Sequence, residues 1–285
     1  MNVVTVPFPS ARSATSAVRC FHYLMGDVRI AAMCALVAIV SVTDPSHADE
    51  TKSPAEPPVV NVIAPLGVVP GRRAELTVRG QRLDAAKALT VKDAAGAEVA
   101  IKSRGRSNPP GAQDAKRVGD TQVVVELTLP ESFASDSVTL IIETDRGGVA
   151  SCRLPVVAAA QHLAEKEPND GFRQAQPIDA DRVVLGQIRQ QRDVDVYRIS
   201  SNASQTWSFN IVAQREGSAM DPILTLYGAD GRMIDTVDDI EGTRDAQLSV
   251  TFPHAGDYYI VVMDAHDQGG PAHPYRLHVE TRGER

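Results

Sequence analysis

The chain has 285 residues, of which 43% are apolar and 23% are charged. This is the composition of a globular protein, so a disordered or fibrous chain is excluded, and the length allows roughly two domains. The formal net charge is −7, and no dense run of Lys and Arg could follow a phosphate backbone. We therefore expect no nucleic acid partner.

Residues 1–48 have the features of a secretory signal sequence. The apolar run 30–42 is too short to span a bilayer, which takes about 20 residues, and Ser46-His47-Ala48 has small residues at both key positions of a cleavage site. A start at Met25 would give a more compact signal and would leave 1–23 as upstream sequence. We expect an exported protein in the periplasm, at the cell surface or outside the cell, with no membrane span after cleavage. The alternative is that this segment remains as a membrane anchor.

The cysteines allow no intramolecular disulfide once the expected signal sequence is removed. Cleavage after Ala48 would remove Cys20 and Cys34, so that Cys152 is the single cysteine left. An exported acidic domain without disulfides often gains stability from calcium instead.

Residues 49–157 indicate a linker and then a first β domain. Residues 49–58 are polar and rich in proline, as in a flexible linker. Short apolar runs follow, separated by turn residues, and Pro109-Pro110-Gly111 predicts a long exposed loop over 104–116. We expect an antiparallel β-sandwich of immunoglobulin type over 59–157. Its expected strands are 59–63, 74–78, 89–92, 98–101, 122–129, 138–143 and 148–157.

Residues 158–285 indicate a second β domain. Residues 158–164 (AAAQHLA) are rich in small residues and predict a linker, and the domain proper is expected from 165 to 285. Asp230-Gly231 between two apolar runs is a strong hairpin signal. The fold class is therefore all-β, with two β-sandwiches in tandem. The expected strands of the second are 183–188, 194–199, 206–212, 223–227, 233–237, 246–252, 258–263 and 275–279.

Acidic residues recur at alternate positions in two segments of the second domain. In an extended chain, Glu165, Glu167 and Asn169 would project to one side, with Asp170 adjacent. Asp193 and Asp195 repeat this spacing. Calcium takes six to eight oxygen ligands, so the two segments together could complete a site. The alternative is a solvated linker whose Asn-Asp-Gly sequence only turns the chain.

Aromatic residues of the second domain fall in pairs on its expected strands. Trp207 and Phe209 would share one face of a strand, whereas Tyr258 and Tyr259 would point to opposite faces. Such residues usually form the core, and a sugar-binding surface would need them exposed.

Several motifs in the second half resemble the bacterial pre-peptidase C-terminal domain. The resemblance spans residues 163–280 and implies a jelly-roll-like β-sandwich. Relatives that bind calcium use the corresponding acidic segments as ligands. The resemblance therefore implies a ligand set here that consists of Glu165, Glu167, Asn169, Asp170 and Asp195. Asp193, which lies two residues before Asp195, aligns less closely with the ligands of these relatives. The motifs are Glu165-Lys-Glu-Pro-Asn-Asp170, Gly186-Gln-Ile188, Asp193-Val-Asp-Val-Tyr197, Asp221-Pro-Ile-Leu-Thr-Leu-Tyr227, Asp230-Gly231, Ala255-Gly-Asp-Tyr-Tyr259 and Tyr275-Arg-Leu277.

The first half resembles TIG/IPT-type immunoglobulin-like domains. This resemblance rests on residues 65–71 (PLGVVPG) and 75–83 (ELTVRGQRL). It implies the same sandwich that the alternating strands predict.

The sequence lacks a G-x-S-x-G elbow, an H-E-x-x-H helix and a phosphate-binding loop. We therefore expect a non-catalytic binding or adhesion protein, stabilised by calcium, that recognises an extracellular or envelope polymer, either a protein or a polysaccharide. The alternatives are an accessory protein of a separate secreted peptidase and a structural component of the cell envelope.

Overall fold

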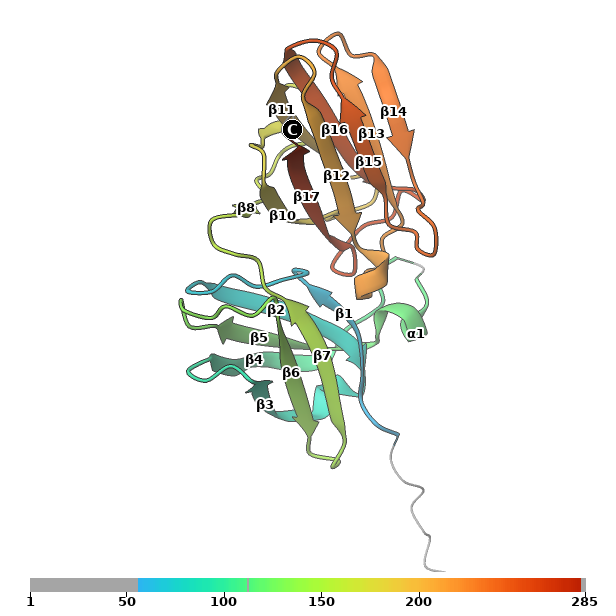
Figure 1. Cartoon of the computed structure of the whole chain (residues 1–285). Coiled ribbons are helices and arrows are strands. Elements are labelled where there is room, and N and C mark those ends of the chain that lie inside the picture. Colours follow the sequence, from blue (N-terminus) through green and yellow to red (C-terminus); the bar gives the residue numbers. More distant parts are fainter. Residues whose placement is uncertain (1–55, 112, 283–285) are drawn as a thin grey trace, which may run out of the picture. The chain divides into compact units, whose positions relative to one another are not determined.

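A computed structural model describes residues 56–111 and 113–282, and these form an all-β protein, as the sequence predicts (Figure 1). The predicted signal sequence and most of the predicted linker 49–58 lie outside the described residues. None of the helices in the described part has the length and apolar character needed to cross a membrane.

The first sandwich consists of a four-stranded sheet in the order β1-β2-β5-β4 and a three-stranded sheet in the order β3-β6-β7. All pairs within these sheets are antiparallel. A 3-10 turn covers Leu83–Ala85, and the short helix α1 covers Ala115–Val118. The strands are β1 (Val59–Ala64), β2 (Arg73–Gln81), β3 (Ala86–Lys92), β4 (Glu98–Arg106), β5 (Thr121–Thr128), β6 (Ser137–Thr144) and β7 (Val149–Pro155).

The core of the first sandwich follows from alternation along its strands. In β5, buried and half-buried residues alternate, and Val123, Val125 and Leu127 face the other sheet. They pack with Leu140 and Ile142 of β6. Because residues that share one face of a strand recur every second position, this pattern could be read from the sequence.

Arg79 is a buried cation that holds the loop between β4 and β5. Only 1% of the surface of this residue is exposed to solvent. The guanidinium donates to the carbonyls of Asn108, Val118 and Gly119 at 3.0, 3.1 and 3.2 Å. Burial lowers the pKa of Arg79, and no ion pair within the described residues involves it. The loop is also shorter than predicted, because β4 extends to Arg106.

The second sandwich consists of two five-stranded sheets, in the orders β15-β12-β17-β10-β8 and β14-β13-β16-β11-β9. A 3-10 turn covers Gln214–Glu216. The strands are β8 (His162–Ala164), β9 (Gln176–Pro177), β10 (Arg182–Gln187), β11 (Val194–Ser201), β12 (Thr206–Val212), β13 (Pro222–Gly228), β14 (Met233–Val237), β15 (Gln247–Thr251), β16 (Gly256–Asp264) and β17 (Pro274–Arg282).

Two short strands of the second sandwich differ from the antiparallel pattern. β8 pairs in parallel with β10, and β9 pairs in parallel with β11. Residues 162–164, which the sequence placed in a linker, therefore belong to a sheet. The predicted hairpin at Asp230-Gly231 joins β13 to β14, and Gly231 has the positive φ of 76° that such turns favour.

The core of the second sandwich lies between its two sheets. It contains Trp207 and Phe209 of β12, which stack with centroids 6.2 Å apart, and Tyr258 of β16. Both predictions about facing are confirmed, since Tyr258 is buried while Tyr259 is only half-buried on the opposite face. Tyr197 and Tyr275 also belong to this core, and their hydroxyls contact the acidic residues described next.

Candidate metal centre

The acidic residues Asp193 and Asp195 are positioned by β11. Asp195, Tyr197 and Ile199 alternate along this strand and point inward, and all three are buried. Asp195 therefore lies on the core-facing side of β11, near the first residue of the strand. Asp193 lies two residues earlier, is 6% exposed, and accepts a hydrogen bond from the Arg189 N–H at 2.6 Å.

Glu167 and Asn169 reach the same place from the segment between β8 and β9. The Val196 N–H donates to the Asn169 carbonyl at 2.9 Å, which fixes this segment to β11. The Gln176 side chain also holds it, because its amide accepts from the Lys166 N–H and donates to the Ala164 carbonyl, both at 2.8 Å.

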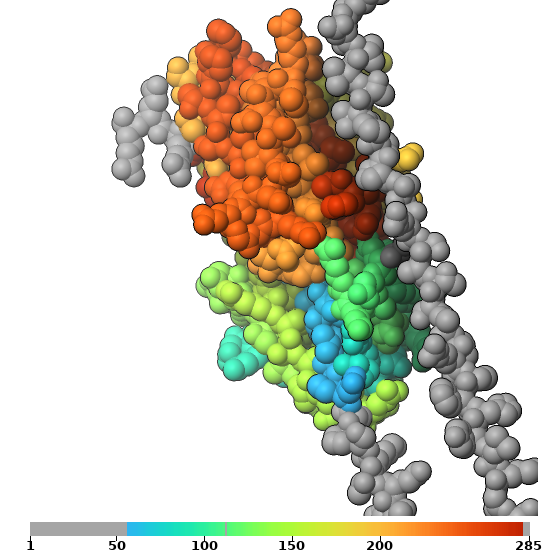
Figure 2. Space-filling model, turned by 90° about the vertical axis from the view of Figure 1, so that its right-hand side faces the viewer, coloured from blue at the N-terminus to red at the C-terminus, as the bar shows by residue number. Residues whose placement is uncertain are grey.

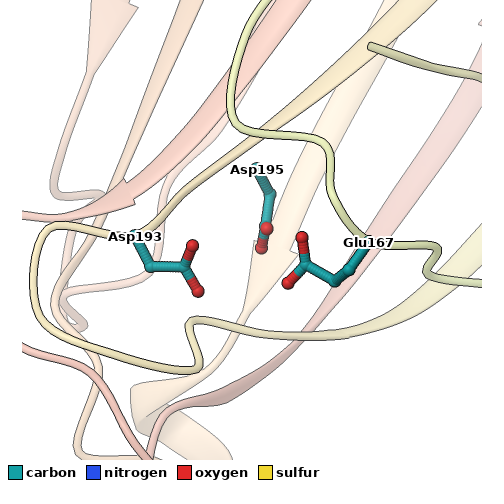
Figure 3. Close-up of side chains that lie close together, drawn as sticks. All are labelled: Glu167, Asp193 and Asp195. Carbon is teal, nitrogen blue, oxygen red and sulfur yellow. The ribbon is translucent and has the colours of Figure 1, made fainter. Parts of the chain in front are cut away.

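Three carboxylates converge between these segments. One oxygen each from Glu167, Asp193 and Asp195 lies within 4.8 Å of the other two (Figure 3). Asp193 and Asp195 are buried and Glu167 is half-buried. All three groups are oxygen ligands, which suit hard cations such as Ca²⁺.

Asn169 adds a fully buried amide to this group. With its nitrogen turned inward, the amide donates to Glu167 Oε2 at 2.7 Å and to Asp195 Oδ1 at 3.2 Å. With its oxygen turned inward, it becomes a fourth oxygen beside the carboxylates, which is unfavourable without a cation. Since the orientation of an amide is assigned from its hydrogen bonds, the cation-free state is the one with nitrogen inward.

Glu165 occupies a layer behind the three carboxylates. Its side chain is 4% exposed, and it accepts from the Gln187 N–H at 3.2 Å and from Arg189 at 3.3 Å. The Tyr197 and Tyr275 hydroxyls lie 3.3 and 3.2 Å from its Oε1. Glu165 thus connects the acidic group to the core.

Tyr275 contacts the acidic group directly. Its hydroxyl donates to Asp195 Oδ2 at 2.6 Å and lies 2.5 Å from the Tyr197 hydroxyl. Burial raises the pKa of each of these two tyrosines well above the ordinary value for tyrosine, so both hydroxyls stay protonated. They orient the carboxylates without neutralising them.

The electrostatic balance of the group is negative. Burial, and next the nearby Glu165 charge, raise the pKa of Asp195 to about 9. Burial and then Asp193 also raise the pKa of Glu167. Arg189 is the cation paired with the group, at 3.1 Å from Glu167 Oε1, but its side chain is 54% exposed. Without a metal ion, Asp195 therefore holds a proton at neutral pH.

Gly186 makes room for the Tyr275 ring. The two residues are partners in the β10–β17 pair, and a Cβ at Gly186 would lie 2.3 Å from the ring carbon that carries the hydroxyl.

We expect Gly186→Ala to lower the free energy of unfolding of the second sandwich by about 1–3 kcal/mol, because the overpacked ring must shift away from Asp195. Urea unfolding followed by Trp207 fluorescence measures this. Gly171→Ala is the matched control, since no atom lies within 4 Å of its Cβ and the expected change is small. Equal stability of both variants would contradict the proposed role of Gly186.

The structure separates the residues that the sequence grouped together. Glu167, Asn169, Asp193 and Asp195 meet, Glu165 lies behind them, and Asp170 is exposed outside the group. No sequence motif indicated a role at the site for Arg189, Tyr197 or Tyr275. The inward alternation of Asp195 and Tyr197 along one strand was the available signal for Tyr197.

Comparison with known proteins concerns the fold only. No family model and no curated protein matches the chain. Among solved structures, the pre-peptidase C-terminal domain of a collagenase from Bacillus anthracis is 14% identical with a TM-score of 0.32, and the match covers 41% of this chain and 100% of that domain. A periplasmic inhibitor of g-type lysozyme from Aeromonas hydrophila is 20% identical with a TM-score of 0.31, covering 38% and 96%.

A third similar structure is a protein of a mixed-linkage glucan utilization locus of Bacteroides ovatus, in complex with a mixed-linkage heptasaccharide. It is 9% identical with a TM-score of 0.26, and the match covers 73% of this chain and 74% of that one. The first match is a domain of the kind that the motifs of residues 163–280 resemble. The TIG/IPT resemblance of the first half stays a prediction.

Proposed function

We propose that this chain is an exported, non-catalytic binding protein whose second sandwich is held in its binding form by one Ca²⁺ ion. Glu167, Asp193 and Asp195 would be carboxylate ligands, and Asn169 would supply its amide oxygen. The observation that carries the proposal is the convergence of three carboxylates, two of which contact one fully buried asparagine.

The charge of the group supports a divalent cation. Glu165, Glu167, Asp193 and Asp195 lie together, and one largely exposed Arg189 is paired with two of them. Unpaired buried carboxylates are costly, and a protein avoids this cost by protonation or by binding a cation. A divalent ion would replace the proton on Asp195.

The ligand chemistry favours calcium over other divalent ions. The group contains neither His nor Cys, which softer metals such as zinc prefer. Its ligands come from a bent segment and from a strand end, which suits the irregular, flexible coordination of Ca²⁺ better than the strict octahedron of Mg²⁺. Water would complete the coordination.

Calcium would tie the segment 165–170 to β11. The Asn169 amide, a backbone hydrogen bond from Val196 and the hydrogen bond from the Tyr197 hydroxyl to Glu165 connect this segment to the strand directly. A cation would add several strong contacts between the same elements and so fix the outer face of this sheet, where we expect an extracellular polymer to bind.

Thermal unfolding tests this function. Trp207 is the single Trp of the chain and is buried in the second sandwich, so its fluorescence reports on that domain. We expect calcium at a hundredfold excess over its dissociation constant to add about 2.7 kcal/mol of stability.

The response should disappear in Glu167→Gln, which keeps the shape of the side chain but removes its charge. It should remain in Asp170→Asn, because Asp170 is exposed outside the group. An equal response to calcium in the Glu167→Gln variant would contradict the proposed ligand set.

A further inference from the structure

The outer face of the sheet β14-β13-β16-β11-β9 carries three aromatic side chains in contact. Tyr227 of β13 and Tyr259 of β16 are partners in register, so they lie side by side. The Phe172 ring stacks on Tyr259, with centroids 4.7 Å apart and an interplanar angle of 29°, and lies 5.3 Å from Tyr227. We call Phe172, Tyr227 and Tyr259 the aromatic platform.

The platform is exposed, unlike the other stacked aromatic pairs of this domain. Phe172 is 40% exposed, and the two tyrosines are half-buried. In contrast, the pairs Trp207–Phe209 and Phe252–Tyr258 belong to the core. In Figure 2, β13 and β14 contribute to a broad orange surface of the second sandwich. Met233 of β14, the register partner of Tyr227, is 59% exposed and extends the apolar surface.

Polar groups flank the platform, and their charges are balanced. Arg198 of β11 is the register partner of Tyr259 and lies 3.4 Å from Asp257. The Ser200 hydroxyl donates to the same carboxylate at 2.6 Å. Among the hydrogen bonds of the described residues, none involves the Tyr227 or Tyr259 hydroxyl. The two tyrosine hydroxyls can therefore donate hydrogen bonds to a ligand and accept them from it. Because Arg198 is paired with Asp257, the ligand does not need a charge of its own.

We propose that the aromatic platform binds a neutral polysaccharide. A pyranose ring has an apolar C–H face and a rim of hydroxyls, so it fits an exposed ring such as Phe172 beside Tyr hydroxyls and a paired Arg198. A peptide that adds to a sheet needs free main-chain groups at an edge, whereas the platform lies on β13 and β16, which are paired on both sides. The inference rests on the proposed binding role and names its ligand class.

Isothermal titration with cellohexaose, laminarihexaose and mannohexaose tests the platform, with oligogalacturonate as the charged comparison and a proline-rich peptide as the alternative ligand. We expect one of the neutral sugars to bind, and both Phe172→Ala and Tyr259→Ala to weaken this binding by about tenfold. Phe172→Tyr should retain it. Val149→Ala, which truncates an apolar residue of the first sandwich that is 56% exposed, should leave it unchanged.

The calcium response separates this inference from the proposed function. Phe172→Ala should keep the calcium-dependent rise in the unfolding midpoint, which also shows that the variant folds. Binding of none of the neutral sugars, binding that both alanine variants leave intact, or binding of the peptide through the platform would each overturn the inference. In all three cases, the proposed metal site would still be supported if calcium raises the unfolding midpoint of the wild type but not that of Glu167→Gln.

Discussion

In a chelator, the contribution of Asp195 to the stability of the second sandwich is expected to fall as the pH rises from about 4 to about 9. The Asp195 pKa is raised to about 9 in the folded protein from an ordinary value of 3.8. Between these values the folded state holds a proton that the unfolded state has released, so each rise in pH favours unfolding. For one proton, the slope is at most about 1.4 kcal/mol per pH unit.

Asp195→Asn isolates this effect. The amide cannot ionise and can still accept the hydrogen bond from Tyr275, so the variant should lose the slope that Asp195 contributes. The surrounding Glu165, Glu167, Asp193 and Arg189 are present in both proteins, so the comparison removes the contributions that do not depend on Asp195. In chelator the stability of the variant relative to that of the wild type should therefore rise as the pH increases above about 4.

Urea unfolding at several pH values, followed by Trp207 fluorescence, measures the difference. Calcium at pH 8 should raise the stability of the wild type but not that of Asp195→Asn, which has no complete site. A wild type and variant that show the same pH dependence in chelator would contradict the buried, protonated state of Asp195.

Replacing Arg79 with methionine is expected to lower the free energy of unfolding of the first sandwich by about 3–5 kcal/mol. Methionine keeps much of the side chain's length but cannot donate hydrogen bonds. The carbonyls of Asn108, Val118 and Gly119 would lose their guanidinium donor in a buried site. An unsatisfied buried polar group retains its desolvation cost, which explains the large effect.

Urea unfolding followed by far-ultraviolet circular dichroism measures the loss, and Trp207 fluorescence identifies the transition that belongs to the second sandwich. The amide protons of Val118 and Gly119 should also exchange faster with solvent, because the loop is less firmly held. Arg73→Ala is the control on the same strand. Its side chain is 71% exposed and 3.5 Å from Glu126, so its removal should cost less than about 1 kcal/mol. Equal losses in both variants would contradict the role of Arg79.

The strands were largely predictable because burial along a strand repeats every second residue. Val123, Val125 and Leu127 show this alternation in the sequence and point to one core in the structure. The same rule separated Tyr258 from Tyr259. It could not find β8 and β9, which are two to three residues long and depend on partners far along the chain.

The acidic group was predictable in composition but not in arrangement. Alternation placed Glu165, Glu167 and Asn169 on one side of an extended segment, but the chain bends at Glu167, so Glu165 turns to the tyrosines instead. The meeting of Glu167 with Asp193 and Asp195 depends on tertiary contacts to β11. No local pattern indicates those contacts, nor the approach of Phe172 to Tyr259.

Equilibrium dialysis of the chelator-treated protein against radioactive calcium tests the central claim most directly, because it counts ions. One calcium ion per chain is expected for the wild type and for Asp170→Asn, and none for Glu167→Gln or Asp195→Asn. The absence of bound calcium in the folded wild type, or undiminished binding in both of the last two variants, would contradict the proposed metal centre.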